Sequence, residues 1–277
     1  MSDDEVVSTI MEDYVRDLVE EGERSDDREL NERRNIKVET DVIDKAEGSA
    51  RVELGDTKVL AGIKVETGTP FPDTPNKGVF TTNVELLPMA SPEFESGPPR
   101  EDAVELARVV DRGIRESETI DLESLVIKEA ELVRIVHADV HVLDYNGNLL
   151  DAIGFAVLAA LKNTTYQKID YNEETGEQVE LDKEVNLPIT DSPIPVTFAK
   201  IDDELILDPN LDEDRAMESR ITISYNDEGN INSIQKGGSG TLMVSDVLKA
   251  AKEGDQYVDE VVRSIEKGVE EKPEKRD

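Results

Sequence analysis

The sequence contains no cysteine and no tryptophan, and aromatic residues make up only 4% of the chain. The lack of cysteine excludes disulfides, thiolate zinc sites and cysteine nucleophiles, and it fits a reducing compartment. Long apolar runs are missing too: the longest mostly apolar stretch, residues 152–161, falls far short of the roughly 20 residues that span a bilayer. The N-terminal MSDDEVV is acidic, whereas a secretory signal begins with basic residues. We therefore expect a cytoplasmic protein that does not engage a membrane.

Positive charge is also scarce. The chain carries 31 Lys and Arg against 65 Asp and Glu, which gives a formal net charge of −34. Such a surface repels phosphate backbones unless a local basic site overrides it, so free-standing binding to nucleic acid should be weak. A solvated acidic surface is the favoured interpretation, and docking on a basic partner is the alternative. With 277 residues, 37% of them hydrophobic, the chain can form one large or two ordinary domains.

Hydrophobic periodicity predicts an α+β fold in two similar halves. Apolar residues at helical spacing predict a leading helix over residues 3–22, and a period of two then predicts strands. The expected strands of the first half cover residues 36–43, 48–55, 57–66, 78–87 and 132–143, with helices over 97–117 and 151–163. The second half is expected to contain strands 195–202, 204–208, 220–226 and 230–236, then one long helix capped by Ser245 and ending near Lys267. Four strands followed by a helix, twice over, suggest an internal duplication.

These patterns predict four segments. Residues 1–32 form an N-terminal helix and a charged segment, and residues 33–164 form the first domain. Residues 165–192 are rich in acids and are expected to form an exposed hairpin and connector. Residues 193–277 form the second domain with its C-terminal helix.

The helix expected over residues 97–117 combines an apolar stripe with an arginine stripe. At 100° per residue, Arg108, Arg112 and Arg115 fall within about 60° of one another, opposite the apolar side chains. The apolar stripe consists of Ala103, Leu106, Ala107, Val110 and Ile114. Guanidinium groups bind phosphates bidentately, so this stripe is the candidate phosphate-binding surface. The alternative is ordinary ion pairing along the helix, involving Glu105, Asp111 or Glu116.

Three other groups of residues have a simpler explanation that we favour. His137, Asp139 and His141 alternate along one strand and could hold a metal, but they also fit the solvent face of an ordinary two-sided strand. The glycine-rich residues 236–240 resemble a phosphate loop in composition, but they lack the lysine followed by Ser or Thr of a Walker motif, and a flexible strand-to-helix turn is the favoured explanation. An acidic run could bind magnesium or form a solvated loop; it comprises Asp208, Asp212, Glu213, Asp214 and Glu218. No residue pattern requires a cofactor or a metal.

Several longer segments resemble a known family. They are DTPNKGVFTTNVELLPMASPEFESGPP and ELARVVDRGIRES within residues 73–117, EGSARVELGDTKVLAGIKVE at 47–66, VHVLDYNGNLLDA at 140–152, and LDPNLDEDRAMESRITISY at 207–225. Together they resemble the RNase PH-like proteins, and specifically the non-catalytic ring subunits of the archaeal exosome. The resemblance covers most of the chain, and the duplicated plan agrees with that family's fold.

The resemblance also implies that this chain is an inactive paralogue. Active members are phosphorolytic exonucleases with three motifs, all of which are altered here. In place of adjacent arginines and a serine the chain has Glu101-Asp102-Ala103, and in place of a GlyGlyThrArg turn it has residues 146–149, NGNL. In place of a GluAlaAsp sequence it has Glu218-Ser219-Arg220, although Asp214 is kept at the earlier acidic position. These changes remove most of the electrostatic stabilisation that the chemistry needs.

The resemblance further implies a place in a complex. The chain would alternate with a catalytic RNase PH-like subunit in a hexameric ring, a trimer of heterodimers with RNA-binding cap proteins and single-stranded RNA in its channel. Arginines at the positions of Arg108 and Arg112 would reach RNA in the partner's site, and Arg115 is an extension from the helical geometry. Two alternatives remain: an independent phosphorolytic 3′-to-5′ exoribonuclease rebuilt from Asp214, Arg220 and the glycine-rich turn, and an acidic interaction protein that never binds RNA.

Overall fold

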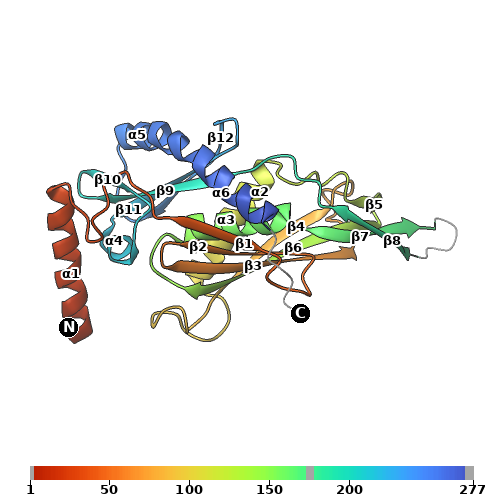
Figure 1. The fold of residues 1–277 in the computed structure, drawn as a ribbon, viewed down its shortest axis with the longest axis horizontal. Coiled ribbons are helices and arrows are strands. Elements are labelled where there is room, and N and C mark those ends of the chain that lie inside the picture. Colours follow the sequence, from red (N-terminus) through yellow and green to blue (C-terminus); the bar gives the residue numbers. More distant parts are fainter. Residues whose placement is uncertain (1–2, 173–177, 272–277) are drawn as a thin grey trace.

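The computed structural model describes residues 3–172 and 178–271, and it has the expected α+β architecture. Two sheets, both mainly antiparallel, face each other across a central helix (Figure 1). A hairpin projects at one end of the molecule, and the N-terminal helix lies at the other end (Figure 1). Within the described residues, no helix is both long and apolar enough to cross a bilayer.

The first sheet has six strands in the order β1-β2-β3-β6-β4, with β5 paired to β6. Its strands are β1 (Ile36–Thr40), β2 (Gly48–Leu54), β3 (Thr57–Gly68), β4 (Val79–Leu86), β5 (Val126–Lys128) and β6 (Leu132–Asp144). All pairs are antiparallel except β4 with β6, because α2 (Glu101–Glu116) lies in the connection between them. β5 is a short strand that the periodicity did not predict.

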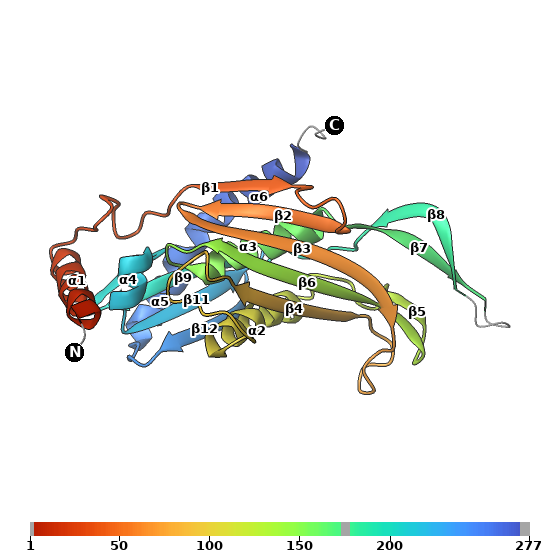
Figure 2. The same ribbon diagram turned by 90° about the horizontal axis from the view of Figure 1, so that it is seen from below.

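The second sheet has four antiparallel strands in the order β10-β9-β11-β12. These are β9 (Ile194–Ile201), β10 (Glu204–Leu207), β11 (Ser219–Tyr225) and β12 (Ile231–Gly238). Helix α3 (Leu149–Lys162) packs on β2 and β3 on one side and on β9 on the other, and residues 149–161 are all buried. The apolar run that the sequence placed in a buried helix is therefore the core shared by the two sheets, as Figure 2 shows from a second direction.

The hairpin of β7 (Thr165–Tyr171) and β8 (Gln178–Asn186) projects from the body, as expected for the acidic segment (Figure 1). Helix α1 (Asp3–Glu20) lies at the opposite end. Its Val15 and Val19 are buried in one apolar cluster with Ile201, Ile206 and Ala216. These contacts hold α1 against the second half of the chain.

The C-terminal region corrects one prediction. Instead of one long helix capped by Ser245, the chain forms α5 (Val244–Gly254), a 3-10 turn (Asp255–Tyr257) and α6 (Val258–Glu270). The N-terminal cap is Met243, whose backbone N–H donates to the Asp246 carboxylate. The helix is interrupted because α5 packs on β11 whereas α6 packs on β1 and α3, so the chain must change direction between them. Gly254 allows the close approach, since a Cβ there would lie 2.4 Å from the hydroxyl of Tyr225.

Candidate functional site

Helix α2 holds the arginine stripe in the orientation that the periodicity predicted. Its buried residues are Ala103, Leu106, Val110 and Ile114, and the helix packs against β4. Arg108, Arg112 and Arg115 are all exposed on the other side. Burial of the apolar stripe therefore fixes the side from which the arginines project.

The three arginines are not equivalent. The Nε of Arg115 donates to Oδ2 of Asp111 at 2.8 Å, one turn earlier, so the ion-pair alternative is correct for this residue. Burial raises the pKa of Asp111, and the Arg115 charge opposes that shift. Arg108 and Arg112, in contrast, make no hydrogen bond or ion pair with any residue in 3–172 or 178–271. These two guanidinium groups are free to contact an anion.

The other end of α2 borders a pocket of about 270 Å³ in which the three altered motifs meet. Asp102 comes from the first turn of α2, Asn148 from the turn before α3, and Asp214 and Arg220 from α4 (Leu211–Ala216) and the start of β11. The remaining lining residues are Leu86, Glu93, Phe94, Glu105, Leu106, Tyr145, Leu149, Leu150, Thr197 and Met217. Segments more than a hundred residues apart in sequence thus form one site.

Acidic side chains dominate this pocket. Four carboxylates line it, from Glu93, Asp102, Glu105 and Asp214, against the single guanidinium of Arg220. That guanidinium is already paired, because its Nη2 donates to Oε1 of Glu105 at 2.6 Å. A cavity with this balance repels phosphate, since none of the described residues that line it offers an unpaired positive charge.

Asp214, the acidic residue that this chain retains at the earlier motif position, is engaged by neighbouring side chains. The hydroxyl of Tyr145 donates to its Oδ2 at 2.9 Å, and Tyr145 stacks on Phe94 with ring centroids 5.2 Å apart. Burial raises the pKa of Asp214, and the hydrogen bond from Tyr145 opposes that shift. Burial, with the Asp214 charge second, also raises the pKa of Tyr145, so this hydroxyl stays protonated and continues to donate. The carboxylate is thus engaged within the chain.

The acidic run from residue 208 to 218 is not the solvated loop that we expected. It contains α4, capped by Asn210 in a capping box with Glu213, and the side chain of Glu213 is buried. Nη2 of Arg24 lies 2.6 Å from Oε2 of Glu213, and both side chains are almost fully buried. The prediction of a solvated loop is wrong because charge does not by itself indicate exposure: Asp208 and Glu213 are buried in pairs with arginines of residues 24–34.

Asp208 is the second anchor of this network. Its carboxylate is buried and accepts from Nη2 of Arg34 at 2.7 Å and from Nδ2 of Asn148 at 2.7 Å. These partners hold the pKa of Asp208 below its usual value despite its burial. Asn148 is in a left-handed conformation, and Gly147 beside it has a φ of 84°. Asp208 and Arg34 therefore hold the turn of residues 146–149 in place, a structural role that the sequence did not indicate for either residue.

The remaining candidates lie apart from this pocket. His137 is 3.0 Å from the hydroxyl of Thr81, and His141 is 3.3 Å from a carboxylate oxygen of Glu85, so both histidines pair with β4. No group of three metal-ligating side chains occurs among the described residues. Gly237 and Gly238 belong to β12 rather than to a phosphate loop, and the N–H of Gly240 donates to the carbonyl of Glu218.

Comparison with known proteins gives a consistent result. The models of the 3′ exoribonuclease family match residues 32–167 with domain 1 and residues 191–254 with domain 2. "Exosome complex component Rrp42" of Thermococcus kodakarensis is 52% identical over 96% of this chain and 99% of its own length. The protein of the same name from Methanothermobacter thermautotrophicus is 46% identical over 96% of this chain and 97% of its own length.

Solved structures agree. A chain of the "archaeoglobus fulgidus exosome with RNA bound to the active site" superposes with a TM-score of 0.86 at 41% identity, covering 93% of this chain and 98% of that one. A chain of an "Archaeal exosome core" gives 0.83 at 37% identity, covering 95% and 99%. The resemblance drawn from the motifs is confirmed: the chain belongs to the 3′ exoribonuclease, or RNase PH, family.

Proposed function

We propose that this chain is a non-catalytic component of an exosome core ring. In this role it structures the active site of a catalytic RNase PH-like partner and contributes Arg108 and Arg112 to RNA binding during 3′-to-5′ phosphorolytic degradation. The near-full-length similarity to proteins named Rrp42, and to chains of archaeal exosomes, supports this assignment.

The observation that carries the proposal is the distribution of charge along helix α2, which is acidic in its first turn and exposes arginines in its middle turns. Its first turn presents acids, Glu101 and Asp102, at the end where active relatives use arginines. Its middle turns present Arg108 and Arg112, exposed and unpaired among the described residues. A helix that repels phosphate at one end and can bind it further along suits a subunit that contacts RNA without cleaving it.

The pocket that the altered motifs form supports the inactive part of the proposal. Phosphorolysis needs positive charge where phosphate attacks and where charge develops in the transition state. Here Arg220 is neutralised by Glu105, and Asp214 is bonded to Tyr145. An independent exonuclease rebuilt from Asp214 and Arg220 is therefore disfavoured.

The partners belong to the same proposal. We assign the chain to a trimer of heterodimers with the catalytic subunit, with RNA-binding cap proteins and single-stranded RNA as further partners in the cytoplasm. The two halves, residues 33–164 and 193–277, would act as one RNase PH-like unit, with residues 1–32 and the hairpin of 165–192 as additions. Arg115 has a lesser role, since Asp111 already neutralises it.

Phosphate-dependent degradation of labelled single-stranded RNA tests the proposal. The chain alone, its catalytic paralogue alone and the mixture are compared, and their masses are measured in parallel. We expect no nucleoside diphosphate release by the chain alone, higher activity on mixing, and a hexamer mass. Release by the chain alone that is abolished by Asp214→Asn would refute inactivity.

The RNA contact is tested separately in the mixture. We expect Arg108→Glu combined with Arg112→Glu to slow degradation while the hexamer still forms. Arg263→Glu is the matched control, because Arg263 is an exposed arginine on another helix, α6. Degradation at the wild-type rate by the double variant would remove the RNA contact from the proposal and leave the ring role intact.

A further inference from the structure

A second pocket, of about 350 Å³, opens at the C-terminal end of α2. Arg115 lines it, so the pocket adjoins the arginine stripe. Its apolar walls come from Phe80 on β4, Ile114 on α2, and Ile120 and Leu122 in the segment that follows the helix. None of the altered motifs contributes to it, so it is distinct from the acidic pocket at the other end of the helix.

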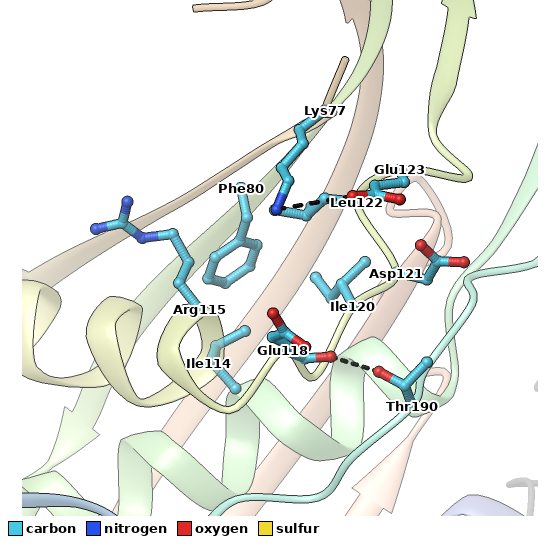
Figure 3. A pocket seen from close by; sticks show the side chains of 10 residues that line it. All are labelled: Lys77, Phe80, Ile114, Arg115, Glu118, Ile120, Asp121, Leu122, Glu123 and Thr190. Carbon is cyan, nitrogen blue, oxygen red and sulfur yellow. Dashed lines mark hydrogen bonds and ion pairs between the residues drawn. The ribbon is translucent and has the colours of Figure 1, made fainter. Parts of the chain in front are cut away.

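Charge is distributed unevenly around this pocket. In Figure 3, Arg115 and Lys77 lie on either side of Phe80. Asp121 and Glu123 lie across the pocket from Phe80, beyond Leu122 (Figure 3). Lys77 is 41% exposed, and its Nζ lies 4.0 Å from Glu123, at the outer limit of an ion pair. An ammonium held this loosely can turn to an anion at the pocket mouth.

Glu118 supplies a hydrogen-bond acceptor along the lower edge in Figure 3. Its backbone carbonyl accepts from the hydroxyl of Thr190, which ties the loop to the chain before β9. Its carboxylate makes no hydrogen bond or ion pair with any residue that the structure describes. This carboxylate is therefore available to a donor on a ligand.

We propose that this pocket binds one ribonucleotide, with the base against Phe80, Ile120 and Leu122, the phosphate at Lys77, and the Glu118 carboxylate accepting from an amino group of the base. A pocket of mixed lining, with an apolar wall, a cation at one edge and an acceptor at the other, matches a nucleotide, which has an apolar face, an anionic end and polar base edges. The volume lies in the range of small-ligand sites. Uracil has no exocyclic amino group and offers only its N3–H, which lies at a different position on the ring, so an acceptor placed for the amino group favours cytosine or adenine over uracil.

The nucleotide can belong to an RNA strand or be free. An RNA strand that follows the exposed arginines of α2 leads towards the pocket through Arg115, and in this form the inference rests on the proposed function. A free mononucleotide needs the pocket alone. The two sources share one chemistry and are separated by the experiment.

The first arm titrates CMP and UMP into the full chain with labelled Ile, Leu and Val methyl groups. CMP and UMP have the same size and the same phosphate and differ only at C4 and N3, where CMP has an amino group and an acceptor nitrogen and UMP has a carbonyl and an N–H, so they are a matched pair. We expect CMP to shift the methyl signals of Ile114, Ile120 and Leu122 at millimolar concentration, and UMP and cytidine to bind more weakly. Lys77→Gln should weaken CMP binding about fivefold, the scale for one partly exposed charged contact. Lys58→Gln is the control, because Lys58 is also 41% exposed and lies outside the pocket.

The second arm measures the affinity of the reconstituted ring for cytosine-rich and uracil-rich RNA. Weaker binding of the cytosine-rich strand by Lys77→Gln assigns the pocket to RNA, and an effect confined to CMP assigns it to free nucleotide. Glu118→Gln should reduce the preference for CMP over UMP in either case. Absence of methyl shifts with CMP, or shifts that Lys77→Gln leaves unchanged, would overturn the site. The degradation assay with the Arg108 and Arg112 variants is independent of this result, so the two failures are distinguishable.

Discussion

The two unpaired arginines of α2 allow a quantitative prediction for the dependence of RNA binding on salt. Arg108→Gln combined with Arg112→Gln removes both charges and keeps side chains of similar length and helix propensity. Each phosphate of a single strand that a protein neutralises contributes about 0.7 to the slope of log affinity against log salt. Since neither arginine has a partner among the described residues, each can contribute a full contact. We expect the slope to become shallower by about 1.4 in the double variant.

This difference is large enough to measure. Between 50 and 200 mM salt, the affinity of the wild-type ring should fall about sevenfold more than that of the variant ring. Arg115→Gln should change the slope by less than about 0.7, because Asp111 at 2.8 Å already neutralises that guanidinium. The paired arginine thus provides an internal comparison on the same helix.

Fluorescence anisotropy of labelled single-stranded RNA on the reconstituted ring, over a salt series, measures the slope. Arg263→Gln serves as a control, since Arg263 is 77% exposed on α6. An unchanged slope for the double variant, with the ring intact, would refute the argument that these arginines neutralise phosphates. An equal change for Arg115→Gln would refute the distinction between paired and free arginines.

Three further predictions concern the framework around the site. Arg24→Leu leaves the Glu213 carboxylate buried without its partner, so we expect a loss of about 3–5 kcal/mol in the free energy of unfolding, measured by urea titration, with partial recovery when Glu213→Leu is added. Burial raises the pKa of Asp151 to about 7. Because an unfolded aspartate titrates near pH 3.9, the native state binds more protons between about pH 4 and 7, and the contribution of this group to stability falls as the pH rises through that window. The stability difference between wild type and Asp151→Asn should therefore change between pH 4 and 7 and level off above, and a constant difference would contradict the shift. Gly147→Ala should cost more than about 1 kcal/mol, because φ is +84° and a Cβ would lie 2.4 Å from the backbone before α4, whereas Gly113→Ala, in open space on α2, should be neutral or stabilising. Similar losses for the two glycine variants would contradict this argument.

Most helices and strands could be predicted because local periodicity determines them. The apolar stripe of α2 is the face that is buried, and the alternation along residues 132–143 places Val136, Ala138, Val140 and Val142 inside. Prediction failed where packing between distant elements determines the local structure. Residues 244–270 have the composition of one helix, but contacts with β11 on one side and with β1 on the other require a break.

The candidate site was predictable in its parts and not in its arrangement. The motif comparison identified residues 101–103, 146–149 and 218–220 as altered, and the structure brings residues of these segments and Asp214 to one pocket. The pairing of Arg220 with Glu105, and of Tyr145 with Asp214, has no sequence signal, because each pair joins elements far apart in the chain.

The sequence alone therefore determined the α+β class, the arginine stripe on its helix and the family, because these depend on local patterns and on motifs. The tertiary structure decided which charges are free. Arg108 and Arg112 differ from Arg115 only in their neighbours, and the acids Asp208 and Glu213 are buried rather than solvated because arginines from residues 24–34 fold back onto them. Pairing and burial depend on contacts between distant residues, and only the folded chain brings those residues together.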